Sequence, residues 1–309
     1  MSENIQNCNT EQRLLLSTYD DSIKVSATQI AIPDFESIQP CSHEEADSRI
    51  ILHAAHCAKQ GYKRISIRTV DTDVVVLAVS HFQKLGLDEL WICFGSGKHY
   101  RNISIHMIAE TLGEKTGALL FFHAFTGCDT VSSFRGKGKK SAWSTWQENP
   151  SMTETFIRLM DKSDDISEEL FLEIQIFVIR MYSKNCPYNN INEARKHIFA
   201  QGGIFENIPP TEAALLQHVK RAVYQACYVW AQSLIPCPIL PSPENWGYKQ
   251  TPHGWKPHWT DLPEAATSST MLVKCGCVKG CNYRCKCQKL NLQCTQLCKC
   301  KGDCSEIYI

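Results

Sequence analysis

The sequence has no long apolar run and no net charge. No segment approaches the roughly 18 consecutive apolar residues of a membrane helix, and the polar first twenty residues do not read as a signal peptide. These absences predict a soluble, intracellular protein without a membrane partner. The 32 basic and 32 acidic residues cancel, so any attraction to a polyanion must come from local basic patches.

Cysteine, by contrast, is abundant and unevenly placed. The chain has 17 cysteines. Eight are scattered singly and are expected to be small buried apolar residues, and the others form a run of nine near the C-terminus. An odd count in a reducing compartment argues against a disulfide framework. A metallothionein-like metal store is disfavoured because Tyr283 and three leucines, enough for a defined small fold, lie among the nine.

The spacing of the nine cysteines is typical of zinc ligands, with three C-x-C pairs. They are Cys275, Cys277, Cys281, Cys285, Cys287, Cys294, Cys298, Cys300 and Cys304. A tetrahedral zinc site takes four thiolates, so about three ions need about twelve ligand positions. Nine thiolates supply twelve if three of them bridge two ions each. We therefore expect about three structural zinc ions, whose binding provides most of the folding free energy of this short segment.

Residues 274–305 resemble the CXC module of tesmin-like and related chromatin proteins, in which such a cluster binds DNA. Seven basic residues accompany the cysteines: Lys274, Lys279, Arg284, Lys286, Lys289, Lys299 and Lys301. In the tesmin-like pattern a tyrosine directly precedes a C-x-C pair and enters the minor groove. Here Arg284 holds that position and Tyr283 lies one residue earlier. The resemblance implies DNA as the partner, these two residues as contacts, and a nuclear location.

The first 150 residues alternate helical and strand patterns. Helical periodicity covers residues 44–60, with Ser42 as the expected N-cap, and a second helix is expected to end near Gly86. Short strands are expected at 64–69 and 90–94, and further helices at 103–112 and 115–125. This alternation predicts an α/β domain with a parallel sheet.

The rest of the chain is expected to fall into three parts. Residues 151–233 read as a helical extension, with helices at 166–182, 191–200 and 211–233, the last capped by Thr211. Residues 234–273 form a linker rich in proline and tryptophan, which packs on the surface of the domain. Residues 274–305 form the zinc-cluster domain.

Five carboxylates stand at the ends of the predicted α/β elements: Glu45, Asp47, Asp71, Asp73 and Asp129. Ligand sites of open parallel sheets lie at the carboxyl ends of the strands. Carboxylates gathered there repel one another unless cations lie between them, and Mg²⁺ or Mn²⁺ suits ligands that are all oxygen. Two such ions can activate water and stabilise the leaving oxygen of a phosphodiester. The alternative is that these acids are solvated helix caps.

A basic, glycine-containing turn follows Asp129. Its candidate phosphate contacts are Arg135, Gly136, Lys137, Gly138, Lys139 and Lys140. The run 129–142 resembles the helix, glycine hairpin and helix of flap endonucleases, and the five carboxylates match the order of that family's acidic motifs. The resemblance, over residues 42–146, implies a partial PIN-like domain within 1–150 and a metal-dependent, structure-specific nuclease. The alternative for the basic run is a solvated loop.

The 40 residues before this region cannot hold the earlier strands and aspartates of the PIN-like fold. We therefore expect the chain to be the later part of a longer protein, or a remnant. Residues 192–259 together with the zinc cluster also resemble a group of uncharacterised, mobile-element-associated invertebrate proteins. Two functions stay open: a DNA-binding, divalent-metal-dependent nuclease with an incomplete site, and a non-catalytic chromatin or DNA-binding protein derived from a mobile element.

Overall fold

The computed structural model describes residues 38–161, 166–201, 207–260, 273–277, 285–290 and 292–302. The chain is mixed α/β, with small sheets and a cysteine-rich cluster. It divides into two compact units. The first is Met1–Thr111 with Gln232–Ile239, and the second is Leu112–Ala231 with Leu240–Ile309. The helices at Lys115–Phe125 and Lys139–Glu148 thus belong to the second unit, with the helices that follow them.

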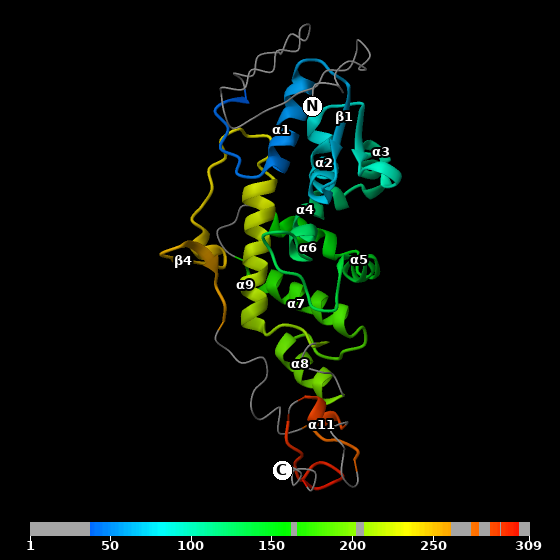
Figure 1. Cartoon of the computed structure of the whole chain (residues 1–309), viewed down its shortest axis with the longest axis vertical. Coiled ribbons are helices and arrows are strands. Elements are labelled where there is room, and N and C mark those ends of the chain that lie inside the picture. Colours follow the sequence, from blue (N-terminus) through cyan, green and yellow to red (C-terminus); the bar gives the residue numbers. More distant parts are fainter. Residues whose placement is uncertain are drawn as a thin grey trace. The chain divides into compact units, whose positions relative to one another are not determined.

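The first unit is a three-stranded sheet with helices (Figure 1). Its elements are α1 (Ala46–Lys59), β1 (Arg64–Thr69), α2 (Thr72–Leu85), β2 (Glu89–Phe94), η3 (Gly97–His99), β3 (Arg101–Ser104) and the start of α3 (Ile105–Leu112). β1 and β2 pair in parallel, as predicted. β3 pairs antiparallel to β2, so the expectation of a wholly parallel sheet is wrong at its third strand.

Apolar side chains from the sheet and two helices build the core of this unit. Leu90 and Ile92 of β2, Ile51 of α1 and Leu77 of α2 are fully buried. α2 ends at Gly86, which adopts the left-handed conformation expected of a helix C-terminus. Two predicted boundaries are wrong: α1 begins after Glu45, not Ser42, and Ile103 joins β3 because it pairs with Ile92.

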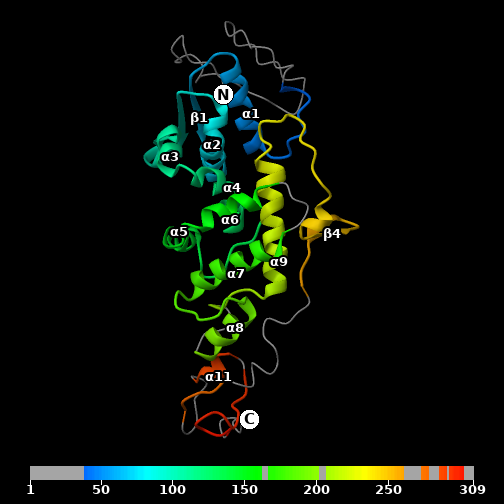
Figure 2. The same ribbon diagram turned by 180° about the vertical axis from the view of Figure 1, so that it is seen from behind.

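The second unit is mainly helical (Figures 1 and 2). Its helices are α4 (Lys115–Phe125), α5 (Lys139–Glu148), α6 (Met152–Leu159), α7 (Glu168–Tyr182), α8 (Ile191–Ala200) and α9 (Glu212–Val223). Aromatic rings form its centre. Phe121 and Phe125 stack at 5.3 Å, and Phe156 lies 5.3 Å from Phe177 in an edge-to-face contact.

The long helix predicted at 211–233 is confirmed only in its first half. The side chain of Thr211 accepts a hydrogen bond from the backbone N–H of Ala214, as expected of an N-cap. After Val223 the chain widens into η5 (Tyr224–Trp230), a π-helix. Cys227, Tyr228 and Trp230 are all buried in this segment.

The predicted linker contains a small β-ribbon that the sequence did not reveal. η6 (Pro243–Trp246) leads into β4 (Tyr248–Thr251) and β5 (Gly254–Pro257), which pair antiparallel. Trp246 is buried, as surface packing of this segment required, whereas Trp255 and Trp259 are exposed. Among the described residues, no helix is both long and apolar enough to cross a membrane.

Candidate metal centres

Three of the predicted carboxylates meet in the first unit. Ligand oxygens of Asp47, Asp71 and Asp73 all lie within 4.8 Å of one another. Asp47 lies in the first turn of α1, and Asp73 in the first turn of α2. Asp71 follows the carboxyl end of β1 directly after Val70. Residues from a strand end and two helix starts therefore converge, as the α/β pattern predicted.

Local backbone chemistry explains why these acids stand where they do. Asp71 is the N-cap of α2: its Oδ1 accepts the backbone N–H of Asp73 at 2.8 Å, and its own N–H donates to Thr69 Oγ1 at 3.0 Å. The N-terminal ends of helices also favour negative charge. Asp71 is exposed, while Asp47 and Asp73 are half-buried. The group therefore has the all-oxygen donor set and the solvent access that suit a hydrated Mg²⁺ or Mn²⁺.

The other two predicted carboxylates stand apart from this group. Glu45 is the N-cap of α1, makes no side-chain capping bond, and does not belong to the set of acids within 4.8 Å. Asp129 is exposed, in the second unit, in the segment after α4. Its participation in the metal site stays a prediction.

The basic turn is present, but the first helix of the expected run 129–142 ends earlier. α4 stops at Phe125, so residues 129–133 are not helical, and the turn itself is Phe134 to Lys137. The backbone N–H of Lys137 donates to the Phe134 carbonyl at 3.1 Å. Gly136 has φ +69°, a conformation that side chains resist, which accounts for glycine there. α5 then begins at Lys139.

Lys139 has a structural role that the sequence did not indicate. Its Nζ donates to the carbonyl oxygens of His123 (2.9 Å) and Gly127 (2.5 Å) and to Thr126 Oγ1 (3.1 Å). It therefore caps the C-terminus of α4 with a positive charge. These contacts compete with its expected role as a phosphate contact, which stays a prediction.

Two side chains from distant helices hold the basic turn. Tyr182 of α7 donates its hydroxyl hydrogen to the Arg135 carbonyl at 3.1 Å, and Lys137 Nζ lies 5.4 Å from the centroid of the Tyr182 ring. His218 of α9 packs edge-on against Phe134 at 4.8 Å. Of the other basic residues, Arg135 and Lys140 are exposed and Lys137 is half-buried, and their predicted role as phosphate contacts stays a prediction.

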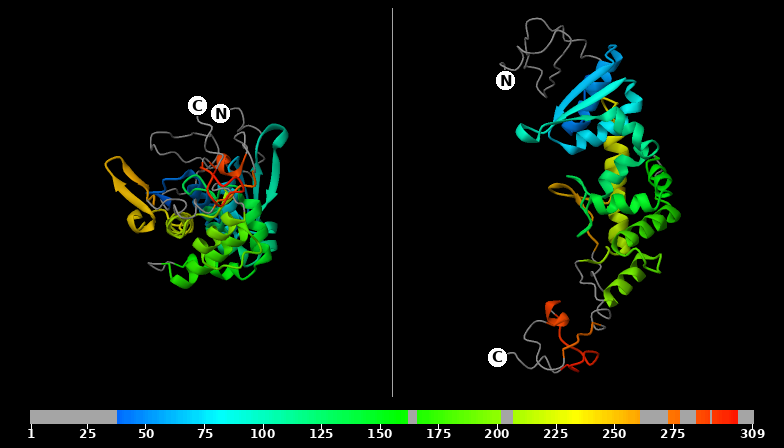
Figure 3. Two further views of the ribbon diagram at one scale, coloured as in Figure 1. Left: turned by 90° about the horizontal axis from the view of Figure 1, so that it is seen from below. Right: turned by 90° about the vertical axis from the view of Figure 1, so that its right-hand side faces the viewer.

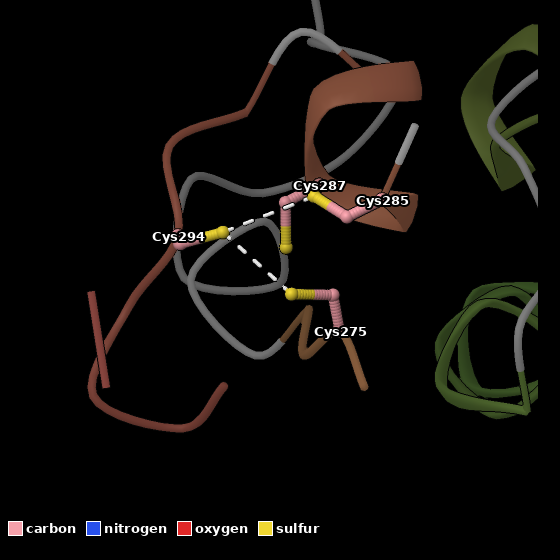
Figure 4. Close-up of side chains that lie close together, drawn as sticks. All are labelled: Cys275, Cys285, Cys287 and Cys294. Atoms are coloured by element: carbon pink, nitrogen blue, oxygen red, sulfur yellow. Dashed lines mark hydrogen bonds between the residues drawn. The ribbon is translucent and has the colours of Figure 1, made fainter. Parts of the chain in front are cut away.

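The described cysteines of the C-terminal cluster form two sets of four. The first set is Cys275, Cys285, Cys287 and Cys294, and the second is Cys275, Cys277, Cys294 and Cys300. Within each set the sulfur atoms lie within 4.8 Å of one another, and Figure 4 shows the first set converging. Each set can hold one metal ion. Cys275 and Cys294 belong to both sets, which is the arrangement of bridging thiolates.

The sulfur separations match a tetrahedral metal site. With metal–sulfur bonds of about 2.3 Å, the edge of a tetrahedron measures about 3.8 Å. The Sγ atom of Cys294 lies 3.6 Å from that of Cys275 and 3.9 Å from that of Cys285, the two separations drawn as dashed lines in Figure 4. Cys275 and Cys277 approach to 2.9 Å, closer than such an edge but well beyond a disulfide bond of about 2.05 Å.

The surroundings of the thiols oppose negative charge unless a cation is present. Burial, together with the neighbouring thiols of Cys298 and Cys275, raises the pKa of Cys287 to about 12. Burial and the adjacent thiols also raise the pKa of Cys294. A bound dication would replace the thiol protons and stabilise the thiolates.

Cys298 has a different environment from its neighbours. Burial acts to raise the pKa of Cys298, but hydrogen bonds outweigh it and lower the pKa. The donors include the backbone N–H groups of Cys275 and Thr295, each 3.4 Å from the Cys298 sulfur. N–H donors of this kind support metal thiolates from outside the ligand sphere. Cys298 Sγ lies 3.6 Å from Cys287 Sγ, which makes it a further ligand candidate.

The cluster packs against the helical unit through an apolar contact that the sequence did not predict. Phe199 of α8 and Ile208 join Val273 and the buried cysteines in one hydrophobic group, with Leu290 and Leu292 beside it. The lysines lie on the outside: Lys274, Lys289, Lys299 and Lys301 are exposed. Most of the described thiols of the cluster are therefore buried, while these four positive charges face solvent.

Cys281, Tyr283, Arg284 and Cys304 lie outside the described residues, so their predicted roles as zinc ligands and DNA contacts stay predictions. No protein-family model, no curated protein and no solved structure gives a significant match to this chain. The function is therefore inferred from the geometry of the two candidate centres.

Proposed function

We propose that this protein binds DNA through a zinc-cluster CXC module and carries a divalent-metal-dependent nuclease site on a partial PIN-like domain. The observation that carries the nuclease half is the meeting of Asp47, Asp71 and Asp73 within 4.8 Å. Asp71 and Asp73 share the N-terminal turn of α2, whereas Asp47 comes from α1, more than 20 residues earlier in the chain. A nuclear location follows from DNA as the partner.

The acidic site has the donor chemistry of a phosphodiesterase centre. Asp47, Asp71 and Asp73 would hold Mg²⁺ or Mn²⁺, which supplies activated water and neutralises developing charge on the leaving oxygen. The chain's own contribution is to fix the carboxylates, two of them through helix α2 and one through α1. Independently of that site, Arg135, Lys137 and Lys140 of the second unit would contact phosphates of bound DNA.

The cysteine cluster supports the DNA-binding half. Two described thiol sets share two sulfurs, so two ions need only six described cysteines. Cys281, Cys298 and Cys304, together with one more shared thiol, would supply the four ligands of a third ion, and three is the count we propose. Exposed lysines around buried thiolates would meet phosphate oxygens, an attraction that weakens as salt rises.

A cleavage assay tests the nuclease half. The full chain with Mn²⁺ should cut labelled flap or single-stranded DNA, and Asp71→Asn should reduce the rate at least about a hundredfold, a loss of about 2.7 kcal/mol in transition-state stabilisation. Asparagine also caps helices, so this variant keeps α2 folded. Asp88→Asn removes an exposed acid of the same unit and serves as the matched control. Equal rates for both variants, or no cleavage by the unmodified chain, would refute the nuclease proposal.

The second candidate is a non-catalytic DNA-binding protein. It is favoured by one observation, that only three of the five predicted carboxylates belong to the described group. A gel-shift assay with duplex DNA, together with the cleavage assay, distinguishes the nuclease from the non-catalytic DNA-binding protein. On this alternative, binding survives Asp71→Asn, disappears with a zinc chelator, and no substrate is cut. If the duplex is not shifted even at low salt, DNA binding is wrong in both versions.

A further inference from the structure

The β4–β5 ribbon is fixed rigidly on α9 and η5. Trp246 is buried against Tyr228 at 5.0 Å, and Tyr248 lies 6.1 Å from Tyr224 in an edge-to-face contact. Gly247, at φ +82°, comes so close to α9 that a Cβ atom there would lie 2.6 Å from the Gln217 carbonyl oxygen. The ribbon root is therefore packed as tightly as a protein core.

The outer part of the ribbon, by contrast, extends away from α9 into solvent, as all three ribbon views show (Figures 1, 2 and 3). Trp255 is 41% exposed and Trp259 is 68% exposed. Trp255 lies in β5, whereas Trp259 follows that strand by two residues, beside α9. Exposed indole rings of this kind are surfaces on which a planar ligand can stack. The guanidinium carbon of Arg221 lies 6.0 Å from the centroid of the Trp259 ring.

The charge of the ribbon has one sign. Residues 245–260 contain two lysines and no acidic residue. Lys249 and Lys256 are exposed and directly opposite each other across the two strands. Like charges in that position destabilise a strand pair. A polyanion would relieve this repulsion, so the lysine pair indicates an anionic partner.

Because side chains alternate between the two faces of a strand, the aromatic and the basic residues of β4 and β5 lie on opposite faces. Trp255 pairs with Gln250 and shares a face with Tyr248, while Lys249 and Lys256 occupy the other face. A duplex buries its base faces and cannot stack on tryptophan. A single strand presents bases to the aromatic face while flexible lysine stems reach its phosphates around the ribbon edge.

We propose that the β4–β5 ribbon is a binding site for single-stranded DNA, with Trp255 and Trp259 stacking on bases and Lys249 and Lys256 contacting phosphates. The choice of DNA rests on the proposed function above. The site is separate from the zinc cluster and from the carboxylates, and it would hold an unpaired strand while the cluster binds duplex.

Fluorescence anisotropy with the full zinc-loaded chain and labelled oligo-dT tests this inference. The double variant Trp255→Ala, Trp259→Ala should weaken binding at least about tenfold, since stacking contributes about 1–3 kcal/mol per base. Trp255→Phe with Trp259→Phe should recover most of that loss, because phenylalanine also stacks. Lys249→Gln with Lys256→Gln should lower the slope of log affinity against log salt by about 1.4.

Tyr188→Ala is the matched control, because Tyr188 is an aromatic residue of the same unit with a similar exposure of 42%. It should leave oligo-dT binding unchanged. The inference fails if the tryptophan double variant binds oligo-dT as the unmodified chain does, if Tyr188→Ala weakens binding equally, or if oligo-U binds more tightly than oligo-dT. If the unmodified chain does not bind oligo-dT but still shifts duplex DNA, the ribbon site is wrong and the proposed function stands.

Discussion

At the scale of single residues, the cysteines differ in how many metal ions they can bind. Cys275 and Cys294 belong to both thiol sets, and the other members belong to one. Cys294→Ser removes a ligand from both sets, whereas Cys277→Ser removes a ligand from one. We predict that Cys294→Ser loses at least one more zinc ion per chain than Cys277→Ser, measured by atomic absorption after gel filtration. Equal losses would mean that the two sets are not linked by shared ligands.

Lys139 and Lys140 are neighbours with different environments. The ammonium of Lys139 binds the C-terminal end of α4, while Lys140 is exposed at the start of α5. Lys139→Met should lower the free energy of unfolding by about 1–3 kcal/mol, because it leaves carbonyl groups without a charged donor. Lys140→Met should change it by less than about 0.5 kcal/mol. Urea denaturation followed by circular dichroism compares them, and the opposite order would contradict the capping role.

His218 gives the second unit a predictable response to acid. Its Nε2–H donates to the Phe125 carbonyl at 2.8 Å, and Ser132 donates its hydroxyl hydrogen to Nδ1 at 3.2 Å. Burial lowers the pKa of His218 from 6.5 to about 4, although the bond to Phe125 acts the other way. The neutral ring is therefore the folded form. Its contribution is complete above pH 6.5 and is lost as the pH falls toward 4, by about 3 kcal/mol.

The variant His218→Asn removes the titrating group from this site. The stability difference between the unmodified chain and the variant should therefore shrink between pH 7 and pH 4.5, measured by urea denaturation at each pH. His253→Gln removes an exposed histidine and should show no such change. A constant difference for His218→Asn across this range would show that His218 is not held neutral by burial.

Among the elements, the root of the ribbon depends on a glycine. Gly247 and Gly254 both have positive φ, but only Gly247 has a neighbour that a Cβ atom would strike. Both alanine substitutions carry the backbone strain of about 1 kcal/mol. Gly247→Ala should cost about 1–3 kcal/mol more than Gly254→Ala, as overpacking does. Equal costs in urea denaturation would mean that the ribbon does not pack closely on α9.

The elements that could be predicted were those with local signals. α8 and β1 occupy the predicted residues, and α2 ends at Gly86, because periodicity and capping residues mark them in the sequence. β3 was missed because its four residues become a strand only by pairing with β2. The ribbon was missed for the same reason, because its strands have four residues each and pair only with one another.

At the scale of the whole molecule, long-range contacts set the limit of prediction. From the sequence, five acids are expected at the ends of helices and strands. The packing of α1 against α2 decides which of them meet, and the three that do are Asp47, Asp71 and Asp73. The spacing of the cysteines predicted shared ligands. It could not predict that Phe199 and Ile208 would cover the cluster, because these residues lie more than 60 positions before Cys275.

Residues outside the cysteine segment, on and after α8, help to bury the zinc cluster. Its metal content should therefore be measured in the full chain. Native mass spectrometry of the full chain, followed by alkylation of accessible thiols, is the most direct measurement. The account predicts about three zinc ions per chain, with Cys275 and Cys294 protected from alkylation. One zinc ion or none, or alkylation of these two cysteines in the zinc-loaded protein, would contradict it.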